Sequence, residues 1–106
     1  MSWLILALAG GVEIAWSQSI KPTDGFTRLL PTIVCVLVGA LSVYLLSLAM
    51  RSLPLGTAYT VWTGIGAVGA FTVGILVLGE QATPMRIAAA GLIVGGLVLM
   101  KISSPG

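Results

Sequence analysis

Apolar residues follow one another in long blocks along this chain, and charged residues fall almost entirely in the short segments between the blocks. The blocks cover residues 1–20, 29–50, 52–79 and 87–100. A helix needs about 20 residues, at about 1.5 Å each, to cross the hydrocarbon core of a bilayer. The last block is the shortest, and it reaches that length if the side chains of Arg86 and Lys101 extend to the two interfaces. The pattern therefore predicts an all-α integral membrane protein with four membrane-spanning helices.

Turn-forming residues separate the blocks and place the ends of the expected helices. Proline and glycine within residues 21–25 stop the first helix. Thr83 can cap the last one, with Pro84 at its first position, where the missing N–H leaves no hydrogen bond unmade. We expect helices at about residues 2–20, 28–50, 54–78 and 84–101. Because the loops are short, consecutive helices should be antiparallel neighbours in a single transmembrane domain of residues 1–106.

The composition agrees with a lipid environment and excludes several classes of function. Hydrophobic residues make up 58% of the chain and charged residues 8%, so no helix carries the broad polar face that a soluble bundle requires. The five basic residues are scattered and form no nucleic-acid patch. The chain contains no histidine, its single cysteine (Cys35) lies in an apolar helix, and no nucleophile stands beside a base. We expect neither an enzyme nor a metal or cofactor site.

The basic residues lie almost evenly on the two sides of the membrane. With four crossings, the two groups are Arg51 and Lys101 on one side and Lys21, Arg28 and Arg86 on the other. Cytoplasmic loops normally carry an excess of Lys and Arg, which sets the orientation of a membrane protein. Two basic residues against three give almost no preference, so we expect the chain to insert in both orientations.

One carboxylate, that of Glu13, interrupts the first apolar block. A charge at membrane depth is costly, and such residues usually meet a counter-ion, a proton or a substrate. The other two acids, Asp24 and Glu80, fall in loops, where a solvated carboxylate is the ordinary interpretation. A protonated Glu13 that bonds to a neighbouring helix is the structural alternative. We expect Glu13 to bind cations and protons.

Residues three or four positions from Glu13 share its helix face. They are Gly10, Trp16 and Ser17. The ring of Trp16 offers a cation a face beside the carboxylate, and Gly10 leaves space for that cation; simple packing of Trp16 is the alternative. The third helix carries a second stripe at the same spacing, formed by Tyr59, Trp62, Thr63 and Gly66. Polar-edged rings with a threonine are typical of a wet cavity between helices, although an aromatic packing seam has the same spacing.

Each of the last two expected helices contains a pair of glycines, and glycine in a membrane helix can allow either a bend or close packing against another helix. Gly64 and Gly66 each weaken the middle of their helix by about 1 kcal/mol relative to alanine, so we expect a bend there, with close helix packing as the alternative. Gly91 and Gly95 in the last helix are expected to serve close packing. In the second helix, Ser42 is weak evidence taken alone, because a serine in a membrane helix usually bonds its own backbone.

Taken together, these positions resemble the small multidrug resistance family along the whole chain. Three segments are similar to the guanidinium exporter branch of that family: residues 10–16 (GGVEIAW), 51–59 (RSLPLGTAY) and 62–69 (WTGIGAVG). Family members that export quaternary ammonium compounds typically lack a tryptophan at the position of Trp16 and have serine at the position of Thr63. The combination of residues therefore favours the guanidinium branch.

The resemblance implies an antiparallel homodimer of two oppositely inserted copies in a bacterial cytoplasmic (inner) membrane. The first three helices would enclose the site, and the fourth would pair across the dimer through Gly91 and Gly95. In the family pattern the residue at Glu13 binds cation and proton in turn, and the glycines at Gly64 and Gly66 form a hinge. The residues that line the site in that pattern stand here at Trp16, Ser42, Tyr59 and Trp62.

A proton-coupled antiporter of guanidinium and small guanidinium-like cations is the function that these residues favour. Two Glu13 carboxylates would hold either protons or the cation, and a planar guanidinium ion can bond both while a tryptophan stacks on its face. Ser42, Tyr59 and Trp62 would hold the carboxylates in place by donating hydrogen bonds. The family pattern differs at Thr60, usually alanine, and at residues 17–19, which are more polar here. These departures widen the expected range towards larger compounds such as guanylurea.

Two other functions stay open on the sequence. The first is a polyspecific exporter of quaternary ammonium or multidrug cations, which have no N–H donors and need loose aromatic surroundings. The polar set Trp16, Ser42 and Thr63 argues against it. The second is a small structural membrane subunit that packs beside a larger partner through Gly91 and Gly95. In that case Glu13 makes only an interhelical bond.

Overall fold

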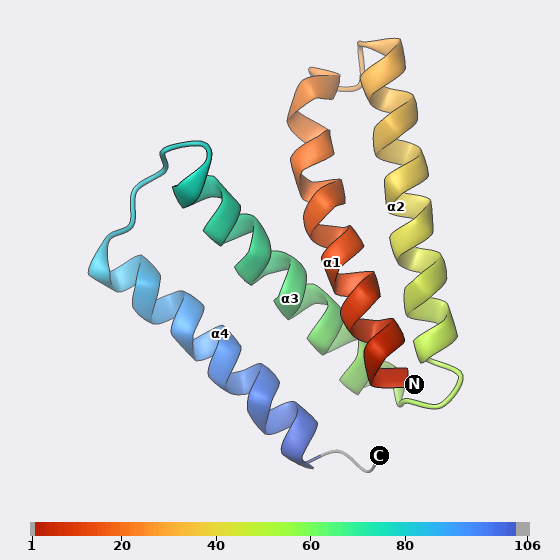
Figure 1. Ribbon diagram of the computed structural model, residues 1–106, viewed down its shortest axis with the longest axis vertical. Coiled ribbons are helices and arrows are strands. Elements are labelled where there is room, and N and C mark those ends of the chain that lie inside the picture. The colour runs from red at the N-terminus through yellow and green to blue at the C-terminus, as the bar shows by residue number, and fades with distance from the viewer. Residues whose placement is uncertain (1, 104–106) are drawn as a thin grey trace.

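The computed structural model describes residues 2–103, and helices account for most of them (Figure 1). They are α1 (Ser2–Ile20), the short 3-10 helix η1 (Lys21–Thr23), α2 (Leu29–Ala49), α3 (Leu55–Leu76) and α4 (Pro84–Ser103). Each of the four α-helices is long and apolar enough to cross a bilayer. The all-α fold with four membrane-spanning helices that the sequence predicts is therefore confirmed.

The helix ends differ from the expected ones by one or two residues because of backbone geometry. Arg28 (φ −95°, ψ 121°) and Pro54 (φ −59°, ψ 148°) are extended, so α2 and α3 each begin one residue later than expected. Helix α3 ends at Leu76, two residues earlier than expected, and the loop that follows it turns at Gly79, whose φ is +71°. At the start of α4, the backbone N–H of Arg86 donates to the Thr83 hydroxyl at 3.2 Å, as expected for the cap.

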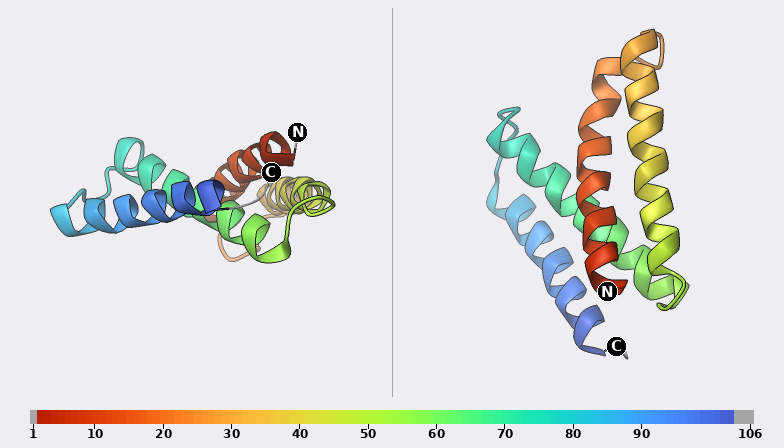
Figure 2. Two further views of the ribbon diagram at one scale, coloured as in Figure 1. Left: turned by 90° about the horizontal axis from the view of Figure 1, so that it is seen from below. Right: turned by 45° about the vertical axis from the view of Figure 1, so that its right-hand side comes forward.

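Helix α1 packs against both α2 and α3 (Figures 1 and 2). α1 and α2 run antiparallel along most of their length, whereas α2 and α3 come together only near the loop that joins them. The expectation that each helix lies beside the next one holds for α2 and α3 only in the half nearest their loop, because both pack mainly on α1. α4 runs along the outer side of α3. The result is a thin arrangement of helices with principal extents of 43 × 35 × 17 Å.

The buried core lies where the N-terminal halves of α1 and α3 meet the C-terminal half of α2. It consists of Leu6, Ala9, Leu46, Ala49, Leu53, Ala58 and Val61. Close approach of α1 and α3 depends on a small residue, since a methyl group on Gly10 would lie 2.6 Å from Cγ2 of Ile65. Towards its C-terminal end α3 diverges from α1 (Figure 1). α1 and α3 are thus packed together at one end of the bundle and separated at the other.

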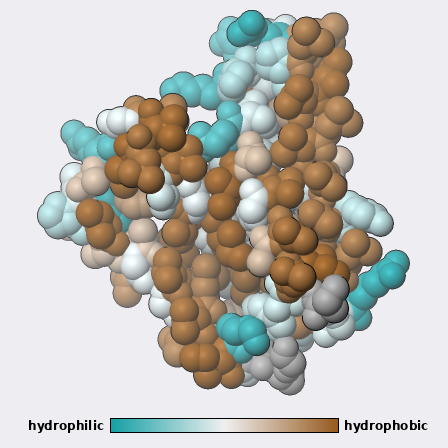
Figure 3. All heavy atoms as spheres, viewed as in Figure 1, coloured by the Kyte–Doolittle hydropathy of each residue, from teal (hydrophilic) through white to brown (hydrophobic). Residues whose placement is uncertain are grey.

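The outside of the molecule is largely apolar. No residue of α4 is buried, and many large aliphatic side chains of the other helices are exposed as well. On the face drawn in Figure 3, apolar side chains cover much of the helices and hydrophilic ones gather towards the helix ends. A surface of this kind is stable when lipid or another protein surface covers it.

Candidate functional site

Glu13 projects from α1 towards α3, where Gly66 makes room for its side chain. A methyl group on Gly66 would overlap Cγ of Glu13 and would lie 3.4 Å from its Cδ and Oε2. Glu13 is partly buried, and within residues 2–103 no hydrogen bond reaches its carboxylate. The carboxylate therefore keeps its full capacity to accept hydrogen bonds from a cation or to take up a proton.

A cavity of about 250 Å³ adjoins Glu13 and is bounded by α1, α2 and α3. Its lining residues are Glu13, Trp16, Val36, Gly39, Ala40, Val43 and Trp62. The fold thus brings Glu13 together with two of the predicted aromatic residues, Trp16 and Trp62. A carboxylate and two indole rings among aliphatic side chains suit a small flat cation. Within residues 2–103, no three His, Cys, Asp or Glu side chains are grouped to hold a metal ion.

Gly39 of α2 belongs to this cavity, although the sequence interpretation assigned it no role. A methyl group on Gly39 would lie 2.8 Å from Nε1 and 2.9 Å from Cδ1 of Trp16, so its absence lets the indole lie directly against α2. The spacing of Gly39, Val36 and Val43 is the signal that could have found this wall, because residues three or four apart share a helix face. All three line the cavity.

Ser42 and Trp62 form a chain of hydrogen bonds that joins three helices. The Ser42 hydroxyl is buried, donates to the Ala9 carbonyl of α1 at 2.8 Å, and accepts from Nε1–H of Trp62 at 2.9 Å. In the single chain these two side chains therefore donate to Ala9 and to Ser42 and not to Glu13, and their donation to Glu13 in a pocket of two copies stays a prediction. Each side chain has one polar proton, and both protons are already used. Their role is to fix the Trp62 ring at the cavity wall.

Three other predicted site residues lie outside this cavity. Tyr59 is exposed, and its ring centroid lies 5.6 Å from that of Trp62 with 45° between the ring planes. Thr63 is exposed on α3, and Gly10 faces Ile65 in the contact between α1 and α3. Tyr59 thus contacts Trp62 but is not among the residues that line the cavity. A binding role for Tyr59, Thr63 and Gly10 stays a prediction.

The glycines of α3 and α4 have different surroundings. α3 is one continuous helix through Gly64 and Gly66. Gly64 faces α4, where a methyl group would lie 2.6 Å from Cδ2 of Leu97, whereas Gly66 faces Glu13. Methyl groups on Gly91 and Gly95 would meet no described atom within 4 Å. The hinge and the dimer contact assigned to these pairs stay predictions.

Replacing Ser42 with alanine is expected to lower the free energy of unfolding by about 1–3 kcal/mol, because the indole N–H of Trp62 then loses its acceptor inside the protein. Urea titration in detergent micelles, followed by tryptophan fluorescence, measures the change. Ser47→Ala is the matched control, because the Ser47 hydroxyl donates to the Tyr44 carbonyl of its own helix and joins no other element. Equal losses in the two variants would contradict the role given to Ser42.

Comparison with known proteins adds an independent line of support. The sequence model of the family described as Small Multidrug Resistance protein matches residues 1–93. Proteins named guanidinium exporter in Citrobacter freundii and Salmonella typhimurium are 53% identical to this chain over 104 residues, which cover 98% of this chain and 99% of each relative. The guanidinium exporter of Escherichia coli (strain K12) is also 53% identical, with the same coverage. The similarity therefore extends across all four helices.

Proposed function

Because the chain belongs to the small multidrug resistance family, we propose that it exports guanidinium and small guanidinium-like cations in exchange for protons. It is a multi-pass protein of the bacterial inner membrane, with four helices capable of crossing the bilayer. Its relatives named guanidinium exporter are similar over almost their whole length. Guanidinium is therefore the first substrate to test.

The observation that carries this proposal is the cavity at Glu13. The carboxylate lies within a membrane-spanning helix, without a hydrogen-bond donor among residues 2–103, and two tryptophan rings share the same cavity. A guanidinium ion is planar and carries N–H donors around its edge, so it can bond a carboxylate while an indole covers its face. A proton that neutralises Glu13 removes the charge that attracts the cation. Proton and guanidinium therefore exclude each other from this group.

The transporting unit is an antiparallel homodimer in the proposal. Nearly balanced loop charges give a single chain little reason to insert in one orientation only. α4 has no buried residue, and Gly91 and Gly95 leave its backbone accessible to close approach by a second helix. Two copies would bring two Glu13 carboxylates to one pocket, where the carboxylates titrate as a coupled pair. Such a pair matches the donors of one guanidinium ion better than a single carboxylate does.

Alternating access follows from two copies with different conformations. Transporters of this kind commonly exchange the conformations of two inverted repeats around a fixed site. Here the inverted repeats are the two copies, and the bend that differs between them lies at Gly64 and Gly66. Because Gly66 also holds the Glu13 side chain, bending α3 at that point changes the surroundings of the carboxylate directly.

The proposal is tested with purified protein in liposomes that contain a pH-sensitive dye. An inward guanidinium gradient should drive protons out of the liposomes, and guanylurea should do the same. Tetrapropylammonium has no N–H donors, and losing charge-assisted hydrogen bonds should make its flux at least about tenfold lower. Equal flux of the two cations would support a quaternary ammonium exporter instead. Guanidinium flux without proton movement would refute the exchange mechanism.

A further inference from the structure

A second and larger cavity opens where α3 diverges from α1. Its volume is about 650 Å³, and it is lined by residues from both helices, from η1, from the loop before α4 and from the first turn of α4. The lining begins one helical turn beyond the Glu13 site, at Ser17 on α1 and Ala70 on α3. It ends among charged residues at the end of the bundle, with Lys21, Glu80 and Arg86 on its wall. The cavity therefore extends from the neighbourhood of Glu13 towards one membrane surface.

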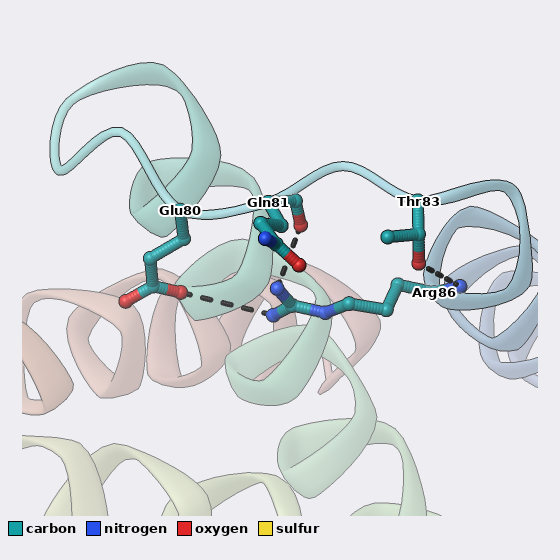
Figure 4. A network of polar contacts seen from close by, with 4 residues as sticks. All are labelled: Glu80, Gln81, Thr83 and Arg86. Atoms are coloured by element: carbon teal, nitrogen blue, oxygen red, sulfur yellow. Dashed lines mark hydrogen bonds and ion pairs between the residues drawn. The ribbon is translucent and has the colours of Figure 1, made fainter.

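Arg86 places its guanidinium group on this wall with three different partners. Nη2 lies 3.8 Å from Oε1 of Glu80, and Nη1 donates a hydrogen bond of 2.6 Å to the Gln81 carbonyl (Figure 4). The carbon atom Cζ lies 5.1 Å from the centre of the Phe71 ring. A carboxylate, a carbonyl and an aromatic face are the groups that bind a free guanidinium ion.

Glu80 is held in the same way as Glu13. A methyl group on Gly74 would lie 2.5 Å from Oε1 of Glu80, so this glycine of α3 makes room for the carboxylate, as Gly66 does for Glu13. The two glycines are eight residues apart, which corresponds to about 12 Å along a helix. Two glycines of α3 therefore make room for carboxylates between the central cavity and the membrane surface, that of Glu13 from α1 and that of Glu80 from the loop after α3.

We propose that the cavity at Glu80 is a second binding site for a guanidinium group, on the route to Glu13, and that Arg86 occupies it with its own guanidinium when no substrate is present. The identity of the cation rests on the proposed function. The free cation replaces Arg86 at Glu80 and stacks on Phe71, and the side chain of Arg86 moves out into the interface. The cation binds at Glu80 before it reaches Glu13, and the Arg86 side chain competes with it for the Glu80 carboxylate.

The exposure of the Glu80–Arg86 pair makes this exchange feasible. The side chains of Arg86 and Glu80 are 42% and 49% exposed, and ion pairs in such positions are weak because water screens them. On the opposite wall, Gln18 donates to the Ser17 hydroxyl, and within residues 2–103 its amide oxygen has no donor. Ser17 and Gln18 both line the cavity, so this wall of the proposed route is polar.

Binding to protein that lacks the central carboxylate tests the second site separately. Titration calorimetry with guanidinium chloride is carried out on full-length Glu13→Gln protein in detergent, alone and combined with Arg86→Ala. Removing the competitor should tighten the remaining binding by about three- to tenfold, into the millimolar range. Adding Glu80→Gln to the double variant should abolish it. If the Glu13→Gln/Arg86→Ala protein binds no more guanidinium than Glu13→Gln alone, the second site does not exist.

Transport kinetics separate a competitor from a merely structural ion pair. Arg86→Ala should lower the KM for guanidinium by about threefold and Glu80→Gln should raise it by about threefold, with kcat nearly unchanged in both. An ion pair that only ties the loop together predicts the same direction of change for both variants, and that outcome would overturn the proposal. Arg28→Ala is the matched control, because it removes a positive charge from the same side of the membrane and lies outside the cavity.

Two further results keep this proposal distinct from the proposed function. Phe71→Leu retains an apolar side chain without the ring and should weaken binding to the Glu13→Gln/Arg86→Ala protein by about threefold, because the cation loses its aromatic face. If wild-type protein transports no guanidinium while the Glu80-dependent binding persists, the proposed function fails and the second site stands. If transport is normal but Glu80-dependent binding is absent, the second site is refuted and the proposed function stands.

Discussion

Guanidinium-driven proton flux is expected to fall by at least about a hundredfold when Glu13 is replaced by glutamine, because two charge-assisted hydrogen bonds are lost or weakened. Glutamine has almost the same size and shape, so the packing against Gly66 is retained. An amide, however, carries no charge for the cation and takes up no proton at neutral pH. The flux is measured with the dye-loaded liposomes used to test the proposed function.

Asp24→Asn is the matched control for this variant, because it also neutralises a carboxylate but in the loop between α1 and α2. Its flux should equal that of the wild-type protein. Glu13→Asp supplies a second comparison, since it keeps the carboxylate but withdraws it by one methylene group, and it should retain part of the activity. Wild-type flux in Glu13→Gln would mean that Glu13 is only a packing or interhelical residue.

A Gly66→Ala variant is expected to transport at least about tenfold more slowly, because a misplaced reactive group lowers the rate steeply. The added methyl group overlaps Cγ of Glu13, so the carboxylate must move away from its position beside Trp16 and Trp62. Alanine favours a helix by about 1 kcal/mol over glycine, so helix propensity by itself does not explain a loss. Initial rates of guanidinium exchange, normalised to reconstituted protein, measure the effect.

Two other glycines of α3 separate a packing effect from a loss of helix flexibility. Among residues 2–103, the methyl group of Gly56→Ala meets no atom within 4 Å outside its own stretch of helix, so this variant should leave the rate unchanged. Gly64→Ala meets the end of the Leu97 side chain, which can rotate, so a loss of rate there reports on the hinge rather than on Glu13. Equal slowing in Gly64→Ala and Gly66→Ala would favour the hinge as the main role of both. A Gly66→Ala protein with wild-type rate would refute the role of Gly66 in holding Glu13.

The four spans, and the place of Glu13 within the first of them, could be predicted from the order of residues in the chain. Hydropathy adds up over about 20 residues, and its sum does not depend on what the helix packs against. The common cavity of Glu13 and Trp16 followed from the helical period, because residues three apart on one helix must share a face. These are local properties of each segment.

The partners that residues find on other helices depended on packing. The sequence does not show that Gly66 makes room for the Glu13 side chain, or that Ser42 bonds to Ala9 and Trp62 in the single chain. The helical period fixes which residues share a face, but not which face of the neighbouring helix they meet. That depends on where small residues allow close approach and how side chains fill the remaining space.

The surroundings of Glu80, the carboxylate in the loop before α4, could not be predicted from the sequence either. Glu80 has the sequence context of an ordinary solvated residue, yet the chain returns after Gly79 so that its carboxylate lies against Gly74 and beside Arg86. The short spacing between Glu80 and Arg86 in the sequence places both near one membrane surface. The cavity that these two residues line forms only because α1 and α3 diverge. Length, hydropathy and helical faces were thus encoded segment by segment. The surroundings of both carboxylates arose from how the four helices cross, because contacts between helices depend on the whole packed chain.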